Sequence, residues 1–88
     1  MFTALLNTAY FFSMVVMKSK KQITEEVGNS IREARENTGI SQEQLSADAG
    51  LYRTYVGHIE VGLYTPSIYT LYKLAKALKL QVKDLIKF

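Results

Sequence analysis

The stretch between residues 41 and 62 constrains the fold more than any other part of this 88-residue chain. It opens with Ser41 and Gln44, which are spaced as a capping box, so that each side chain can satisfy a backbone amide at the start of a helix. Gly50 follows about two helical turns later, and glycine readily adopts the positive φ that ends a helix in a tight turn. A second apolar repeat follows that turn. The pattern therefore predicts two short helices that pack across a tight turn.

The residue types at the expected crossing point agree with this arrangement. Ser46 is small enough to let the two helices approach each other. Leu45, Val56 and Ile59 are apolar and can fix the angle between them. Such an angle projects the start of the second helix outward, where it can enter a DNA major groove about 12 Å wide. The motif, at about residues 41–60, is therefore interpreted as a helix-turn-helix.

Three further helices are predicted around this pair. The first is expected to start after Thr24, a favourable N-cap, and to stop at Gly39. After the pair, whose second helix is expected over about residues 53–60, a fourth helix is expected from near Ser67. A short fifth helix is expected over about residues 82–87. Since no β-hairpin signal occurs, the predicted fold is all-α, a five-helix bundle with an additional apolar N-terminal segment.

That N-terminal segment, residues 1–17, carries no charge, and 13 of its 17 residues are hydrophobic. Three interpretations stay open. The segment is a leader that precedes a start at Met14 or Met17, or a packing and dimerisation helix with one apolar stripe. The third is a membrane anchor, although a span needs about 20 apolar residues. Residues 18–21 are predicted to be a basic linker, and residues 22–88 the DNA-binding domain.

The charges of the chain favour a polyanionic partner only in its flanks. The net charge is +3, but residues 22–64 hold three Arg against six Glu and one Asp, a net charge of −4. The positive charge comes from residues 18–21, with +3, and from residues 65–88, with +4. DNA affinity needs positive charge that faces phosphates, so the flanks of the motif must supply it.

The residue counts exclude several kinds of site. There is no Cys, which excludes disulfides and cysteine-ligated metals. His58 is the single histidine, which excludes a multi-histidine metal site. Without a paired nucleophile and base, or a glycine-rich phosphate loop, the chain is not expected to be an enzyme. No cofactor, metal or small-molecule ligand is expected.

Five stretches carry a resemblance to a known family: Ile31-Arg32-x-x-Arg35, Gly39-Ile40-Ser41-Gln42-x-x-Leu45, Gly50-Leu51, Ile59-Glu60-x-Gly62 and Pro66-Ser67-x-x-x-Leu71-x-Lys73-x-Ala75-x-Ala77-Leu78. Over about residues 25–86 the chain resembles the phage-repressor or Cro-like helix-turn-helix family, also called the XRE family. Within it, Arg53-Thr54-Tyr55-Val56 is most similar to controller proteins of restriction–modification systems, which are small dimeric transcription regulators.

The resemblance implies DNA contacts for individual residues. Gln42 is similar to the Gln that binds a phosphate and braces the second helix of the pair, the recognition helix, which is called the reading helix below. Tyr55 matches a position that often touches phosphate. Arg53, Thr54 and His58 match base-reading positions. An arginine there can pair bidentately with guanine, the commonest specific base contact.

The resemblance also implies structural roles. Arg35 and Glu60 match an ion pair that ties the first helix to the reading helix. Leu85, Ile86 and Phe88 lie where relatives often dimerise. A two-fold dimer presents two reading helices about one DNA turn apart, near 34 Å.

The expected function is therefore that of a cytoplasmic, sequence-specific transcription regulator, which binds double-stranded DNA as a homodimer on a pseudo-palindromic operator. The chain departs from the family after the reading helix, where Val61, Leu63 and Tyr64 replace residues that are often Arg, Lys or Asn. The alternative function is that of an antitoxin-like module that neutralises a partner toxin. RNA polymerase is a further candidate protein partner.

Overall fold

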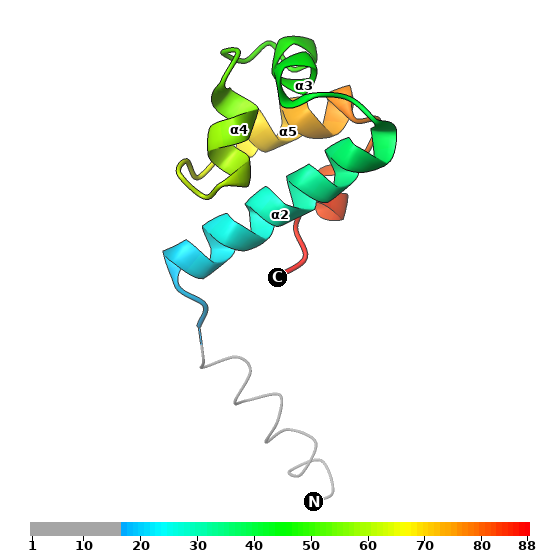
Figure 1. Ribbon diagram of the computed structural model, residues 1–88. Helices are drawn as coiled ribbons and strands as arrows, with labels where there is room; N and C mark the ends of the chain where they lie inside the picture. The colour runs from blue at the N-terminus through cyan, green and yellow to red at the C-terminus, as the bar shows by residue number, and fades with distance from the viewer. Residues whose placement is uncertain (1–16) are drawn as a thin grey trace, which may run out of the picture.

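The computed structural model describes residues 17–88, and every regular element in that range is helical. The elements are α2 (Lys20–Thr38), α3 (Gln42–Asp48), α4 (Tyr55–Glu60), α5 (Ile68–Ala77) and the 3-10 helix η1 (Val82–Asp84). Helix α2 runs along one side, and α3, α4 and α5 lie together on the other (Figure 1). The predicted all-α class is confirmed. The fifth helix is shorter than expected, because only a 3-10 turn forms there.

Helix α2 begins earlier than predicted, at Lys20, with Ser19 as its N-cap. The Ser19 hydroxyl accepts a hydrogen bond from the Gln22 amide at 3.1 Å, and the Gln22 side chain accepts one from the Ser19 amide at 2.8 Å. This reciprocal box satisfies two amides, whereas a threonine cap alone would satisfy one. The prediction of a basic linker over residues 18–21 is therefore wrong, because half of that range lies in the first turn of α2.

Thr24, predicted as the N-cap, lies inside α2 and is buried. Its hydroxyl shares a hydrogen bond of 2.7 Å with the hydroxyl of Thr65, in the loop before α5. It stands one turn before Val27 on the inward side of the helix, which explains its burial. Thr24 therefore ties α2 to the loop that leaves α4 rather than capping a helix.

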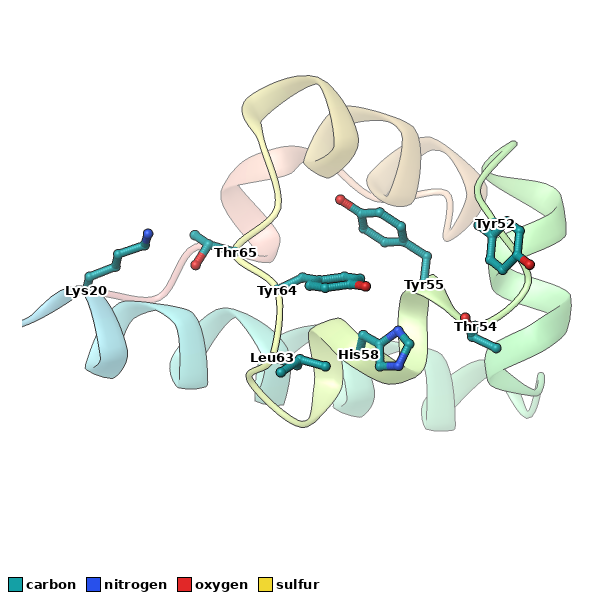
Figure 2. Close-up of a pocket in the computed structure, with 8 residues that line it drawn as sticks. All are labelled: Lys20, Tyr52, Thr54, Tyr55, His58, Leu63, Tyr64 and Thr65. Carbon is teal, nitrogen blue, oxygen red and sulfur yellow. The ribbon is translucent and has the colours of Figure 1, made fainter.

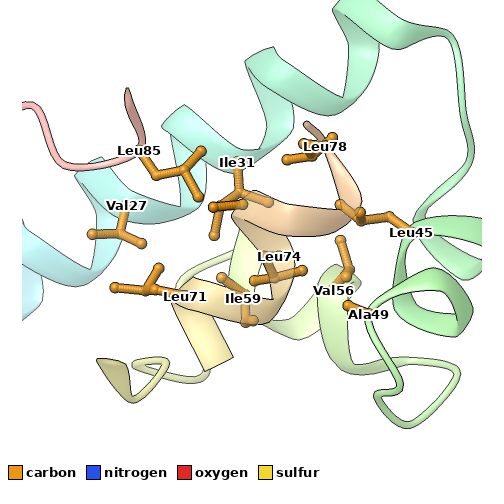
Figure 3. Packing of buried hydrophobic residues seen from close by; sticks show 11 residues of the cluster. Val27, Ile31, Leu45, Ala49, Val56, Ile59, Leu71, Leu74, Leu78 and Leu85 are labelled. Carbon is orange, nitrogen blue, oxygen red and sulfur yellow. The ribbon is translucent and has the colours of Figure 1, made fainter. Parts of the chain in front are cut away.

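The hydrophobic core lies where α2 meets the other helices (Figure 3). All four α-helices contribute to it, and so does the chain that follows η1. The residues predicted to lock the helix-turn-helix are among its members. The core consists of Val27, Ile31, Leu45, Ala49, Val56, Ile59, Leu71, Leu74, Ala75, Leu78 and Leu85.

Leu85, predicted to lie at a dimer interface, has a side chain that is fully buried beside α2 (Figure 3). The turn at η1 explains this position. The Gln81 amide donates to Asp84 Oδ2 at 2.9 Å, and the Leu85 amide donates to the Val82 carbonyl at 2.9 Å. The chain thus turns back toward the core. The assignment of Leu85 to a dimer interface is wrong, since its surface is already used within one chain.

Within residues 17–88, no helix is both long enough and apolar enough to cross a membrane. The leader, packing helix or anchor predicted over residues 1–17 lies outside the described residues, apart from Met17. Met17 itself is exposed.

Gly28 allows α4 to lie directly against α2. A Cβ atom on Gly28 would overlap the carbonyl oxygen of Ile59 and would lie 3.1 Å from the carbonyl oxygen of Glu60. Both oxygens belong to the backbone, which cannot rotate aside as the end of a flexible side chain can. Any larger residue at position 28 would therefore push the two helices apart.

Replacing Gly28 with alanine should destabilise the domain, although alanine is the better helix former by about 1 kcal/mol. Overpacking costs about 1–3 kcal/mol, and we expect it to outweigh that gain because the clash involves backbone on both sides. The midpoint of urea unfolding measures the effect. Asn29→Ala, at an exposed position of the same helix, is the control. An unchanged or higher midpoint for Gly28→Ala would contradict the expected clash.

Candidate nucleic-acid interface

The last residue of α4, Glu60, carries a carboxylate whose side chain has no exposed surface. Arg35 of α2 donates to it from Nε to Oε2 at 2.6 Å and from Nη2 to Oε1 at 3.0 Å. The same guanidinium donates from Nη1 to the carbonyl of Ile40 at 2.9 Å. The ion pair expected between Arg35 and Glu60 is thus present, and it joins α2, the turn after α2 and α4.

Two more side chains reach Glu60. Gln42, at the start of α3, donates from Nε2 to Oε1 at 2.8 Å. Arg32 donates from Nη2 to the main-chain carbonyl of Glu60 at 3.2 Å, and its Nε lies 3.4 Å from Oε1. A buried carboxylate needs such donors, because an unpaired buried charge is very costly. Glu60 therefore holds α4 to α2 and α3 together.

Sequence patterns indicated neither the contact between Arg32 and Glu60 nor the reason why position 57 is a glycine. Arg32 lies three residues before Arg35, a spacing that places both on one helix face, and this spacing was the available signal. At Gly57, a Cβ atom would lie 3.1 Å from Gln42 Oε1. A glycine inside a short helix indicates a close approach of this kind. Gly57 thus lets the Gln42 side chain lie over α4 and brace it.

The turn between α3 and α4 depends on Ser46 and Gly50. The buried hydroxyl of Ser46 accepts a hydrogen bond from the Val56 amide at 3.1 Å, which holds the first turn of α4 against α3. Gly50 has a φ of 68°, as the turn prediction requires. Helix α4 begins at Tyr55 rather than at Arg53, and its N-cap residue makes no side-chain capping bond. Arg53 therefore lies in the turn that precedes the helix.

Burial by itself would raise the pKa of the Glu60 carboxyl. The hydrogen bonds from Arg35 and Gln42, together with the positive charge of Arg35, outweigh burial and hold that pKa below its ordinary value. The hydrogen bond to Glu60 likewise raises the pKa of Arg35. Both groups are therefore charged at neutral pH.

The lowered pKa of Glu60 makes the stability of the domain depend on pH. A carboxyl with a lower pKa in the folded state contributes stability above its unfolded pKa, about 4.3, and loses it as pH falls through the folded value. We expect the urea midpoint to fall as pH drops below about 5. Glu60→Gln should lose about 3 kcal/mol at pH 7, because Arg35 is left unpaired.

The urea midpoint of Glu60→Gln should also fall less on acidification than that of the wild type. Glu25→Gln removes an exposed carboxylate of α2 and serves as the control. An acid decline in Glu60→Gln as steep as that of the wild type would contradict this origin of the pH dependence.

The structure brings together three of the residues expected to contact DNA, two at base-reading positions and one, Tyr55, at a phosphate-contacting position. Thr54, Tyr55 and His58 project on the same side of α4 (Figure 2). Arg53 stands in the turn before them with 79% of its side chain exposed, and its Nε lies 3.1 Å from Glu43 Oε2. An exposed ion pair of this kind contributes little. The Arg53 guanidinium can therefore exchange Glu43 for another acceptor.

Tyr64, in the loop after α4, organises the aromatic side chains on this face. Its ring lies between those of Tyr55 and His58 (Figure 2), with centroid distances of 5.2 and 4.9 Å. The Nδ1 atom of His58 is buried and has no hydrogen-bond partner. Nε2 is therefore the nitrogen of His58 that a ligand can reach. Sequence patterns indicated Tyr64 as a departure from the family, but not its packing between Tyr55 and His58.

Residues 31–85 match the family model described as Helix-turn-helix. The chain belongs to the helix-turn-helix family. Its relatives include control protein C.BamHI of Bacillus amyloliquefaciens, 39% identical over 62 residues that cover 69% of this chain and 76% of that protein. Control protein C.SmaI of Serratia marcescens is 39% identical over 64 residues, which cover 73% of this chain and 76% of that protein.

Two solved structures agree with this helix-turn-helix assignment. The restriction-modification controller protein C.AhdI of Aeromonas hydrophila has a TM-score of 0.70 and 38% identity, covering 72% of this chain and 96% of that one. The hypothetical transcription factor NHTF of Neisseria has a TM-score of 0.72 and 29% identity, covering 82% and 84%. The predicted XRE-type family, with its similarity to controller proteins, is confirmed. The family is one of DNA-binding transcription regulators, and these relatives are named as control or controller proteins rather than as enzymes.

Proposed function

We propose that this chain is a cytoplasmic, sequence-specific transcription regulator that binds double-stranded DNA as a homodimer on a pseudo-palindromic operator. The fixed position of α4 carries the proposal: Glu60 anchors its end, while Arg53 and Thr54 stand exposed at its start. The start of a helix held in this way can enter the major groove. Similarity to the two control proteins supports the same function.

The residues proposed to contact DNA offer different kinds of contact. The guanidinium of Arg53 can bind O6 and N7 of one guanine, and Nε2 of His58 can donate to or accept from a base edge. Thr54 offers a hydroxyl, and a methyl group that can contact thymine. The Tyr55 hydroxyl suits a phosphate oxygen, and so does the second amide hydrogen of Gln42, whose first is used inside the domain.

Selection of bound duplexes from a random DNA pool tests this function. The full chain should enrich one pseudo-palindromic motif, with half-sites about one DNA turn apart, near 34 Å. Failure to enrich any motif would contradict the proposal. It would instead favour the antitoxin-like alternative, which the net charge of −4 over residues 22–64 supports. Co-purification with the product of a neighbouring gene would then identify the protein partner.

Arg53→Ala should abolish the preference for one base position in the selected motif. Loss of a bidentate pair costs about 1–3 kcal/mol of discrimination, and the unfolding midpoint should not change because the side chain is exposed. Titration of the selected duplex and of its single-base variants measures this. Lys83→Ala, an exposed lysine of η1, removes the same charge elsewhere. If Arg53→Ala keeps the parental preference, Arg53 is not a reading residue.

Dimerisation is proposed to use apolar side chains that the fold leaves exposed. With Leu85 buried in the core, the predicted set retains Ile86, which is half-buried, and Phe88, which is 52% exposed. Ile68 and Tyr69 of α5 are exposed as well, at 72% and 67%. Contiguous exposed apolar surface marks interaction sites, and we propose that these side chains contribute such a surface to the dimer. A six-residue reading helix also contacts few bases, so a two-fold repeat of the site would add selectivity.

Phe88→Ser should therefore shift the protein from dimer toward monomer. Sedimentation of the full chain at micromolar concentration, without DNA, measures the shift. Val61→Ser changes another exposed apolar residue, outside this set, and should leave the dimer intact. A wild-type chain that is monomeric under these conditions would contradict the proposed dimer.

A further inference from the structure

A groove beside the reading side of α4 extends beyond the contacts described so far. Its volume is about 550 Å³, and it extends from the first turn of α2 along α4 (Figure 2). Lys20 stands at the α2 end, Tyr55 and His58 line the α4 side, and Tyr64 and Thr65 come from the loop after α4. Three separate parts of the chain thus converge on one open channel.

The charge of this groove is opposite to that of its surroundings. Residues 22–64 have a net charge of −4, yet no acidic side chain lines the groove, and its single charged residue is Lys20. The neighbouring Lys18 is neutralised by Glu26, with 2.6 Å between Nζ and Oε1. Lys20 makes no ion pair with any other part of residues 17–88. Its charge is therefore available to an anion from outside the chain.

The walls of the groove match the chemistry of a sugar–phosphate chain. The hydroxyls of Tyr55 and Tyr64 make no hydrogen bond within residues 17–88 and can donate to phosphate oxygens. The faces of the tyrosine rings and the Leu63 side chain offer apolar surface to a deoxyribose. Since Tyr55 and His58 belong to both the groove and the reading side, the groove continues the proposed DNA surface.

We propose that this groove binds the sugar–phosphate backbone that borders the major groove occupied by α4. Lys20 neutralises one phosphate, and the Tyr64 hydroxyl donates to a phosphate oxygen while its ring covers the adjoining sugar. In this way hydroxyls and one lysine supply the backbone contacts along a groove that no acidic side chain lines. The inference rests on the proposed function, because it assumes that α4 enters duplex DNA.

Lys20 and Lys21 form a matched pair for the test. They are adjacent and both exposed, but Lys21 does not line the groove. The logarithm of the binding constant falls with the logarithm of salt concentration, with a slope of about −0.9 for each phosphate that the protein neutralises. We expect Lys20→Ala to reduce the magnitude of this slope by about 0.9 relative to Lys21→Ala. Random-sequence duplex is the probe, since backbone contacts do not depend on sequence.

Tyr64→Phe separates the hydroxyl from the ring. The variant keeps the packing against Tyr55 and His58, so it should unfold like the wild type. Its affinity should fall about 3- to 10-fold, by a similar factor on every duplex and with an unchanged salt slope, because one neutral hydrogen bond is removed. Tyr72→Phe, on the exposed side of α5, is the control and should bind like the wild type.

The outcomes distinguish failure of the groove proposal from failure of the proposed function on which it rests. Equal salt slopes for Lys20→Ala and Lys21→Ala would overturn the groove proposal, even if Arg53→Ala loses its base preference and the regulator function stands. A reduced slope for Lys20→Ala alone would support the groove, even if selection enriches no motif. A wild-type chain that binds no duplex at all would overturn both.

Discussion

The buried carboxylate of Glu60 is the constraint on which the rest of the structure depends. It stays charged inside the domain because Arg35, Arg32 and Gln42 surround it with donors. These donors come from α2 and from the start of α3, so satisfying one charge sets the mutual position of three helices. A six-residue helix has too few internal hydrogen bonds to be stable alone in water. Helix α4 therefore takes its orientation from this network rather than from its own backbone.

Two contacts through small residues, Gly28 and Ser46, also help to fix the position of α4. Gly28 lets α4 lie on α2 without a side chain between them, and the Ser46 hydroxyl holds the first turn of α4 against α3. Together with the charged contacts at Glu60, they fix both ends of the short helix. The side of α4 that carries Thr54 and His58, with the His58 ring beside that of Tyr64, is thereby held outward on a rigid helix, as major-groove binding requires.

Charge in this domain is divided between holding the fold and offering contacts to DNA. Of the three arginines in residues 22–64, two are engaged with Glu60, and Arg53 is the most exposed of the three. In the proposed DNA complex, lysines therefore have to supply the positive charge that phosphates need. Because Lys20 belongs to α2, which begins earlier than its sequence pattern indicated, it stands at the end of a groove and not in a flexible arm.

Local patterns were enough to give the all-α class, the turn at Gly50, and Leu45, Val56 and Ile59 as core residues. Periodicity and turn chemistry act over a few neighbouring residues, and a single sequence records them directly. The burial of Leu85 and the contacts of Arg32 and Gln42 with Glu60 depended on the tertiary structure, and the Arg35–Glu60 pair was predicted only through the resemblance to the family. The hydrogen bonds from Arg35 and Arg32 to Glu60 join residues that are 25 and 28 positions apart. Such contacts depend on which surfaces meet after folding, and no local spacing contains that information.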